Sequence, residues 1–300
     1  MSKHNIIILD YVWIDGYNKL RSKKRTIVEN DGLSIDSVEK IPIWNFDGSS
    51  TGQAEGSCSE IILKPCALFD DPLQNGNYIS DNIIYKIVLC TTYKDEYPTA
   101  TNHRDKAFSI FQKKMDEEPW FGLEQEYFLI DKDTGYPLGF CNDGSTRKQG
   151  DYYCGLGSEN SFGRQIVEEH LSLCIKAGVK IAGINAEVAP GQWEFQIGIC
   201  EGIEAGDHLW IARYLLLRVA EMHNVCVSFE PKPIKGNWNG SGCHTNYSTK
   251  IMRSSKCEHN ESMLAIYNAI ECLKNKHNEH MKIYGENNDK RMTGDHETSS

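Results

Sequence analysis

Residues 185–198 read NAEVAPGQWEFQIG and place two acids, Glu187 and Glu194, on either side of the pair Pro190-Gly191. Pro and Gly suit the two central positions of a type II turn, in which the Gly takes a positive φ. We therefore expect a β-hairpin whose directly opposed pairs are Ala189–Gln192, Val188–Trp193 and Glu187–Glu194. Like charges directly opposite each other on paired strands repel. Something else must therefore stabilise the acidic pair.

Composition limits the possible answers. The 300 residues suffice for one large domain or two smaller ones, and 40% hydrophobic with 25% charged residues is typical of a globular enzyme. A formal net charge of −10 argues against a general binder of nucleic acid or of anionic membranes. No apolar run approaches the ~18 residues of a membrane span. The N-terminus shows no signal-peptide pattern, and the 11 cysteines form no CxxC pair, so we expect a cytoplasmic protein with reduced thiols.

The pattern along the chain predicts an α+β fold. Residues 5–97 contain four strand-like runs, separated by polar segments that include the loop WNFDGSSTGQAEGSCSE: IIILDYVWID, KLRSKKRTIVE, SEIILKP and IIYKIVLCTTY. In residues 98–300 helices alternate with strands, starting with a helix from about His103 to Met115. We therefore predict a small β-rich domain over 5–97 and a larger mixed domain over 98–300.

Three further helices follow from apolar spacing and end signals. The first stops at Gly178, the second has Asp207 as its N-cap, and the third covers about 261–280. The expected inward face of the first helix is Ile166, Val167, His170, Leu171, Cys174 and Ile175. The expected inward face of the second is Ile211, Leu215, Val219 and Met222.

Two more acids lie on a predicted strand. Glu124 and Glu126, in WFGLEQEYFLID, are two residues apart and so share a face. A solvent-facing position would explain any one of these acids. Four of them among apolar neighbours, with one pair opposed across strands, instead suggest a bound cation. All-oxygen ligation favours a hard ion, Mg²⁺ or Mn²⁺.

His244, in GNWNGSGCHTNYS, is a further candidate ligand. The preceding Gly236, Gly240 and Gly242 suggest that the backbone approaches a ligand closely, although glycines in a surface loop and a buried histidine satisfied by a neighbour would also fit. The segment is not a phosphate-binding Walker loop, because GK[ST] is absent.

Five motifs, taken with these acids, resemble the eukaryotic type of glutamine synthetase: GLEQEY, NAEVAPGQWEFQIG, GDHLWIARY, PKPIKGNWNGSGCHTN and RMTGDHET. The resemblance covers essentially the whole chain. It implies a small N-terminal β-grasp domain and a larger catalytic domain whose antiparallel strands form an active-site half-barrel. It also implies a homo-oligomer, a double-ring decamer, with active sites between subunits.

The resemblance implies the reaction as well: ATP-dependent ligation of ammonia to L-glutamate, giving L-glutamine through γ-glutamyl phosphate, with two or more Mg²⁺ or Mn²⁺ ions. Glu124 and His244 match ligands of the metal that activates glutamate, and Glu124 therefore lies at the substrate. Three acids match the metal on the ATP phosphates: Glu126, Glu187 and Glu194. Asn237, Trp238 and Arg291 match glutamate contacts. Trp120, Asn246 and Ser248 match nucleotide contacts.

Two more acids match the residues that handle ammonia. Asp47, in FDGSS, matches an aspartate that reaches into the neighbouring subunit's site, although an Asp before Gly is also a common turn residue. Glu297 matches a glutamate on a flap that closes over the intermediate and excludes water.

The chain departs from the family pattern in two places. Glu60 stands where relatives usually have Asp, and its extra methylene could displace a carboxylate by roughly 1 Å. Relatives also continue past the position of Ser300 with phosphate-binding arginines and a last metal ligand. Two alternatives to glutamine synthesis therefore stay open: ligation of a larger amine to the γ-carboxyl group of glutamate, and a non-catalytic structural or decoy subunit.

Overall fold

The computed structural model describes residues 6–28, 35–74, 83–254 and 259–291. Its strands are β1 Ile6–Ile14, β2 Leu20–Val28, β3 Trp44–Asp47, β4 Glu60–Asp70, β5 Ile83–Lys94, β6 Tyr97–Pro98, β7 Trp120–Asp131, β8 Ile181–Ala186, β9 Gln192–Glu201, β10 Val225–Ser228 and β11 Cys243–Ser248. Its α-helices are α1 Arg104–Phe111, α2 Arg164–Ala177, α3 Glu204–Met222, α4 His259–Asn275 and α5 His277–Met281.

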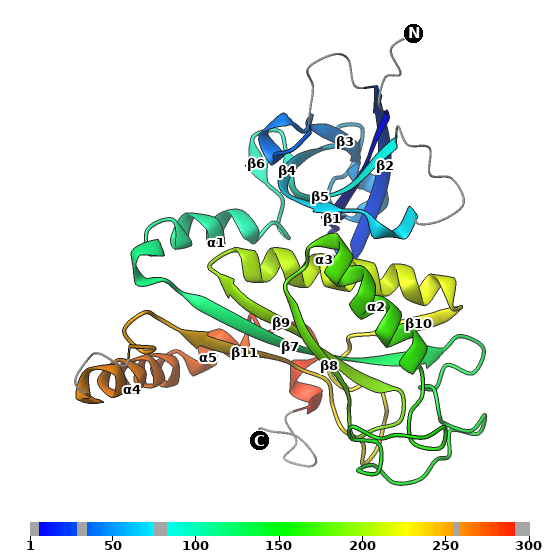
Figure 1. Cartoon of the computed structure of the whole chain (residues 1–300). Coiled ribbons are helices and arrows are strands. Elements are labelled where there is room, and N and C mark those ends of the chain that lie inside the picture. Colours follow the sequence, from blue (N-terminus) through cyan, green and yellow to red (C-terminus); the bar gives the residue numbers. More distant parts are fainter. Residues whose placement is uncertain (1–5, 29–34, 75–82, 255–258, 292–300) are drawn as a thin grey trace. The chain divides into compact units, whose positions relative to one another are not determined.

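The strands form two sheets (Figure 1), and the chain divides into two compact units that contain one sheet each. The first unit comprises Met1–Lys113, Ser172–Val179 and Gly206–Tyr214, and the second comprises Lys114–Leu171, Lys180–Ala205 and Leu215–Ser300. The α+β fold with an antiparallel, curled half-barrel sheet is thus confirmed. The division of the sequence at residue 97 stays a prediction.

The sheet of the first unit has the order β2-β1-β5-β4-β3, and β6 pairs with β5. β1 and β5 are parallel, whereas the other pairs are antiparallel. The four strands expected from the sequence are present. β3 was not predicted, because we assigned WNFD to a polar loop. Its Trp44 and Phe46 point to the core, while Asn45 and Asp47 are exposed.

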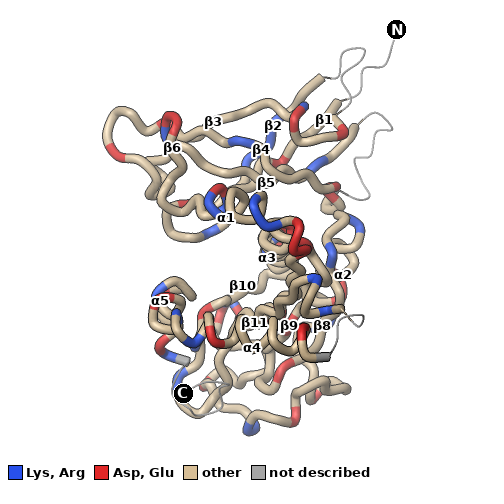
Figure 2. Tube along the Cα trace, turned by 90° about the vertical axis from the view of Figure 1, so that its left-hand side faces the viewer, with Lys and Arg blue, Asp and Glu red and all other residues tan. Residues whose placement is uncertain are grey.

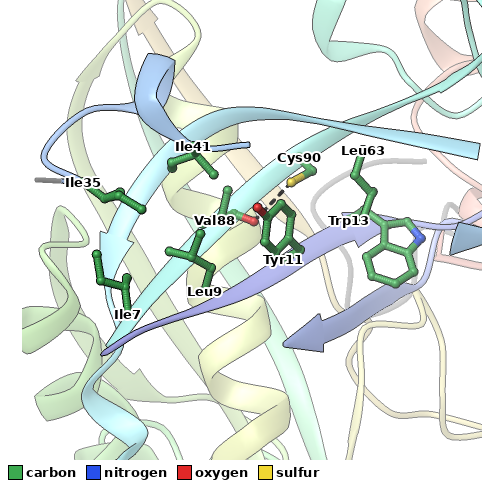
Figure 3. Packing of buried hydrophobic residues seen from close by; sticks show 9 residues of the cluster. All are labelled: Ile7, Leu9, Tyr11, Trp13, Ile35, Ile41, Leu63, Val88 and Cys90. Carbon is green, nitrogen blue, oxygen red and sulfur yellow. Dashed lines mark hydrogen bonds between the residues drawn. The ribbon is translucent and has the colours of Figure 1, made fainter. Parts of the chain in front are cut away.

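β1 supplies much of the core of this sheet. Ile7, Leu9, Tyr11 and Trp13 follow the two-residue period of a strand and all point into one buried cluster (Figure 3). Full burial of such a side chain contributes ~1.5–3 kcal/mol. The Tyr11 hydroxyl donates to the Pro42 carbonyl at 2.7 Å, and burial raises the pKa of Tyr11 to about 12. This phenol therefore stays protonated at neutral pH.

Asp207 does not cap α3, contrary to our prediction. The N-cap is Ile203, and Asp207 lies one turn inside the helix. Its carboxylate accepts two hydrogen bonds of 2.7 Å from Arg104, whose guanidinium also donates to the Cys66 carbonyl at 3.3 Å. A bidentate pair with arginine is one of the strongest hydrogen-bonded arrangements available to a carboxylate. On the predicted inward face, Met222 is exposed, whereas Ile211, Leu215 and Val219 are buried.

The sheet of the second unit has the order β10-β7-β9-β8, and β11 also pairs with β7. All these pairs are antiparallel. β7 is central: one edge pairs with β9, and the other pairs with β11 and then with β10. Three buried side chains of β9 lie on one face of this sheet, Trp193, Phe195 and Ile197. The acids of the sequence analysis alternate with them and therefore lie on the opposite face.

α2 covers the apolar face, because the His170 ring meets Phe195 edge-on, with 5.2 Å between ring centroids. The helix ends at Gly178, whose φ of +82° fits the predicted stop. Ile175 is exposed rather than buried, while Leu173 and Ala177 are buried. The buried face of α2 therefore follows spacings of three and four residues from His170. Ile175 is five residues from His170 and points away from that face.

Two other helices differ in extent from the prediction. α1 ends at Phe111 rather than near Met115, and the backbone has left the helical region at Lys114, with φ −134° and ψ 12°. The helix expected over 261–280 is present as α4 and α5, which Lys276 separates with φ −110° and ψ 7°.

The described cysteines, ten in number, carry free thiols. None of the described helices has the length and hydropathy that crossing a bilayer requires. Lys and Arg are interspersed with Asp and Glu along the trace in Figure 2.

Candidate active site

Strand pairing in the second unit brings the acids together. Glu126 on β7 lies directly opposite Glu194 on β9, and Glu124 lies opposite His244 on β11. Because β7 pairs with β9 on one edge and with β11 on the other, three strands contribute to one polar face. Five side chains that the sequence analysis singled out as metal ligands therefore lie close to one another: Glu124, Glu126, Glu187, Glu194 and His244.

The 185–198 hairpin forms, but its register differs from the prediction. The turn is as expected, since the Gln192 N–H donates to the Ala189 carbonyl at 3.2 Å and Gly191 has φ +70°. Beyond it, the N–H of Glu187 donates to the Gln192 carbonyl, and Asn185 rather than Glu187 lies opposite Glu194.

Two extra residues in the loop therefore displace the predicted pairing by two positions. Because a strand repeats every two residues, the displacement leaves Glu187 and Glu194 on the same face. The opposed acidic pair is Glu126–Glu194, and Glu187 is a diagonal neighbour.

The acids and the histidine form two groups of three. Glu124, Glu194 and His244 make one, and Glu126, Glu187 and Glu194 make the other; within each group one ligand atom per residue lies within 4.8 Å of the others. Glu194 belongs to both. Glu126, Glu187 and Glu194 are buried, whereas Glu124 and His244 are partly exposed. Such a donor set, rich in carboxylate oxygens, suits a hard divalent cation.

The electrostatics of the acids agree with a site for a cation. Burial, with the charges of Glu126 and Glu194 in addition, raises the pKa of Glu187 to about 7. Burial is also the main cause that raises the pKa of Glu194, while a hydrogen bond from Gln196 lowers it. Without a cation these carboxylates therefore hold protons more tightly than free side chains do.

Polar contacts hold the carboxylates of Glu124 and Glu126 in place. His244 Nδ1 lies 3.3 Å from Glu124 Oε2, and the Asn246 amide donates to Glu124 Oε1 at 2.8 Å. The N–H of Gly242 donates to Glu126 Oε2 at 2.6 Å. The glycine-rich segment before His244 thus approaches an acid of the cluster closely, which agrees with the close backbone approach expected from its glycines.

The loop that carries Asn237 and Trp238 is anchored beside the cluster. The Gln192 amide donates to the Gly240 carbonyl at 2.9 Å, and the Asn239 N–H donates to the Gln149 side chain at 2.7 Å. Trp238 packs on Phe140 with 5.0 Å between ring centroids. Asn237 therefore lies three residues before Gly240, whose carbonyl is bonded to Gln192 of β9.

Trp120 and Ser248 lie directly opposite each other on β7 and β11. Arg253 joins them, although the sequence analysis missed it: its guanidinium lies 3.6 Å from the centroid of a Trp120 ring and donates to the Ser248 carbonyl and hydroxyl at 2.8 and 2.9 Å. The sequence signal available for Arg253 was its positive charge five residues after Ser248, a predicted nucleotide contact. Asn246, the third predicted nucleotide contact, donates to Glu124 as described above.

Tyr153, which was not predicted from the sequence, also lies near the acids. The segment 150–154 runs beside the hairpin, since Gly150 donates to the Val188 carbonyl at 2.9 Å and Cys154 donates to the Ala186 carbonyl at 3.0 Å. The exposed phenol of Tyr153 has a raised pKa because of the adjacent Cys154 and then the charge of Glu187. Tyr153 thus lies near enough to the acids for their charge to act on it.

Three predicted site residues lie outside the cluster or outside the described atoms. Asp47 is an exposed residue of the first unit, where its carboxylate accepts from the N–H and hydroxyl of Ser49 at 3.0 and 2.7 Å. Those bonds lower its pKa, the hydroxyl being the larger cause. Arg291 ends a short 3₁₀ helix, Asn288–Arg291, and its side chain is outside the description. Glu297 lies outside the described residues.

Glu60, which departs from the family pattern, lies directly opposite Asp47 across β3 and β4. Its carboxylate accepts a hydrogen bond from Asn45. The two acids are therefore neighbours on one strand pair.

Comparison with known proteins shows which family the chain resembles. The sequence model of the glutamine synthetase catalytic domain matches residues 105–265. Glutamine synthetase of Agaricus bisporus is 51% identical over 290 residues, which are 96% of this chain and 77% of that protein. The cytosolic isozyme 1-1 of glutamine synthetase from Oryza sativa is 50% identical over 297 residues, 98% of this chain and 79% of that protein.

A solved structure of GmaS in complex with ADP has a similar fold, with a TM-score of 0.59 at 18% identity. The match covers 81% of this chain and about half, 53%, of the length of that one. Sequence identity of about one half over nearly the whole chain, together with the matched catalytic domain, shows that this chain belongs to the glutamine synthetase family.

Proposed function

We propose that the face of β7, β9 and β11 catalyses the formation of L-glutamine from L-glutamate and ammonia, with ATP as the phosphoryl donor. Glutamine synthesis is the activity of the family to which the chain belongs. The single observation that carries the proposal is the pair of three-residue groups that share Glu194. Two cation positions side by side suit a reaction that moves a phosphoryl group between two anions.

The residues present fit Mg²⁺ or Mn²⁺. The five side chains form two groups of three that share Glu194, so two ions are expected. Glu124 and His244 would hold the ion nearer glutamate, and Glu126 and Glu187 the ion nearer the ATP phosphates, with Glu194 between them. When bound, such ions neutralise the charge of the transferring phosphoryl group.

The reaction has two steps. An oxygen of the glutamate γ-carboxylate attacks the γ-phosphorus of ATP, and ADP leaves. The nitrogen of ammonia then attacks the carbonyl carbon (Cδ) of γ-glutamyl phosphate and loses a proton, and inorganic phosphate leaves. Phosphorylation is needed because a carboxylate is a poor electrophile, whereas phosphate is a good leaving group.

The chain's residues would hold the substrates around the ions. Asn237, Trp238 and Arg291 would bind glutamate, a role in which the guanidinium fork of Arg291 suits a carboxylate. Trp120, Ser248 and Asn246 would bind the nucleotide, and Arg253, whose guanidinium lies over the Trp120 ring, would add a positive charge beside them.

Two acids would manage ammonia. The lowered pKa of Asp47 keeps its carboxylate ionised at neutral pH, which suits attraction of an ammonium ion. Glu297 would close over the intermediate and keep water out. Because Asp47 would act in a neighbouring subunit, the proposal includes a ring-shaped homo-oligomer, a double-ring decamer. A cytosolic isozyme among the relatives supports a cytoplasmic location.

The test measures phosphate release and labelled glutamine with ATP, Mg²⁺, glutamate and ¹⁵N-ammonium. We expect release that requires all four, and a loss of ~10²-fold or more in turnover in Glu126→Gln, because a charge stabiliser of the transition state is weakened. Glu168→Gln on α2 removes the same charge outside the cluster and is the matched control. Turnover with a larger amine but not with ammonium would contradict the proposal.

A further inference from the structure

A chain of neutral amides holds two acids of the cluster. The Gln196 amide nitrogen donates to Glu194 Oε1 and also to Asn185 Oδ1, the latter at 2.6 Å. Asn185 in turn donates from its own amide nitrogen to Glu187 Oε1 at 3.0 Å. A single glutamine thus reaches Glu194 directly and Glu187 through one intermediate side chain.

These amides occupy the polar face for the same reason as the acids. Gln196 lies two residues after Glu194 on β9, and Asn185 lies two residues before Glu187 at the end of β8. Residues two apart on a strand share a face. Asn185 is also directly opposite Glu194 in the strand pairing. The sequence spacing and the register together therefore put both amides beside the acids.

A glycine makes room for this arrangement. Gly183 on β8 lies directly opposite Gln196, and a Cβ atom at position 183 would lie 2.5 Å from Gln196 Oε1. That distance is shorter than real Cβ contacts, so any side chain at 183 would push the carboxamide away. Because the displaced atom is the end of a flexible side chain, the strand itself could keep its conformation. Gly183 thus permits the Gln196 carboxamide to lie where it does.

The chemistry of the amides suits a metal site that must stay acidic. An amide N–H satisfies one carboxylate oxygen without adding charge, so the cluster retains its full attraction for a cation. A lysine or arginine in the same place would neutralise the acids and compete with the ion. Groups that orient metal ligands in this way typically change metal affinity by ~10–100-fold when they are removed.

We propose that Gln196 is a positioning residue that couples the two metal sites, since it orients the carboxylate that both sites share. Asn185 serves only the group formed by Glu126, Glu187 and Glu194, and Gly183 serves both sites through Gln196. The proposal rests on the proposed function, because it takes the two groups to be divalent-ion sites.

The experiment is a titration of the metal-free protein with Mn²⁺ alone, followed by electron paramagnetic resonance of the free ion. Wild type should bind two ions. Gln196→Ala should weaken both sites by ~10-fold or more, whereas Asn185→Ala should weaken one site and leave the other within ~2-fold. Gly183→Ala should reproduce Gln196→Ala, although residue 196 is unchanged. Gly206→Ala on α3, where a Cβ atom would meet nothing within 4 Å, is the matched control and should bind as wild type does.

The outcomes separate this proposal from the proposed function. If wild type binds two ions but Gln196→Ala and Gly183→Ala bind as well as wild type, the positioning role is refuted and the metal sites stand. A Gln196→Ala protein that loses affinity at one site only would refute the coupling. If wild type binds no Mn²⁺, the metal sites of the proposed function are themselves refuted. Melting temperatures in EDTA verify that each variant is folded.

Discussion

Glu126 and Glu194 lie directly opposite each other on the antiparallel strands β7 and β9. Like charges in that position destabilise a strand pair. The same two acids belong to the three-residue group completed by Glu187, and Glu194 also belongs to the group of Glu124 and His244. The arrangement is therefore unfavourable in the empty protein and favourable once a cation is bound, so stability and function are expected to oppose each other here.

Neutralising one acid of the Glu126–Glu194 pair should stabilise the metal-free protein and should reduce the stabilisation that Mg²⁺ provides. In EDTA, Glu126→Gln should raise the free energy of unfolding by ~0.2–1 kcal/mol, because the opposed charges are removed. In Mg²⁺ the wild type should gain more than the variant, since a ligand that binds only the folded state stabilises it. Urea denaturation in both buffers measures the two differences.

Glu168→Gln on α2 is the control, because its side chain is exposed and lies outside the cluster. It should change neither value by more than ~0.5 kcal/mol. Equal stabilisation of wild type and Glu126→Gln by Mg²⁺ would show that Glu126 is not part of a cation site.

The stability of the metal-free protein should fall as pH rises towards 7. The pKa of Glu187 is about 7 in the folded protein and 4.5 is its ordinary value, so the folded state binds a proton that the unfolded state has released. This stabilising contribution is complete below pH 4.5 and is lost as pH rises through 7. Urea denaturation in EDTA between pH 5.5 and 8 measures the trend.

Glu187→Gln isolates that contribution, because the wild-type curve minus the variant curve contains only the titration of Glu187 and its coupling to the neighbouring acids. The difference should shrink in Mn²⁺, since an ion displaces the proton. A difference curve that is flat from pH 5.5 to 8 in EDTA would contradict the raised pKa.

The turn of the hairpin should tolerate no side chain at position 191. Gly191 has φ +70°, and a Cβ atom there would lie 2.8 and 2.9 Å from the backbone O and N of Leu138. Gly178 also has a positive φ, +82°, but a Cβ atom there would meet nothing within 4 Å. Gly178→Ala should therefore cost ~1–2 kcal/mol for the conformation alone.

Gly191→Ala should destabilise by ~1–3 kcal/mol more than Gly178→Ala, because overpacking is added to the conformational strain. Urea denaturation of the two variants side by side gives the difference. Equal losses would mean that the loop of Leu138 moves freely away from the turn.

Much of the acidic face of β7, β9 and β11 could be predicted from the sequence. Strand periodicity places Glu124, Glu126, Glu187 and Glu194 on polar positions, whichever residues pair across the strands. The register of the hairpin could not be predicted. A Pro-Gly pair predicts the turn, but the two extra loop residues before it depend on tertiary contacts, such as the hydrogen bond from Gly150 to the Val188 carbonyl.

Residues distant in the sequence were missed for a similar reason. The contact of Arg253 with Trp120 and the nearness of Tyr153 to the acids depend on tertiary packing, which the spacing of residues along the chain does not give. Asn185 and Gln196 were within the opening stretch itself, yet an amide on a strand carries no signal until the register shows which acid it meets. The same applies to Asp207, which reads as a helix cap until Arg104 is placed beside it.

Breaking that ion pair should be costly in the first unit. Arg104→Met would leave the Asp207 carboxylate buried without its bidentate partner, and loss of one member of such a pair typically costs 3–5 kcal/mol, so we expect ~3 kcal/mol or more. The double variant Arg104→Met/Asp207→Leu should recover most of the loss, because no unpaired charge remains. Thermal melting of the three proteins tests this; a double variant less stable than Arg104→Met would contradict it.

The number of Mn²⁺ ions bound by wild type and by Glu194→Gln tests the central claim most directly. Because Glu194 belongs to both three-residue groups, the account predicts two ions for wild type and a loss of affinity at both sites in the variant, by ~10-fold or more each. Free Mn²⁺ measured by electron paramagnetic resonance during the titration gives both affinities. Two unchanged sites in Glu194→Gln, or no bound ion in wild type, would contradict the account.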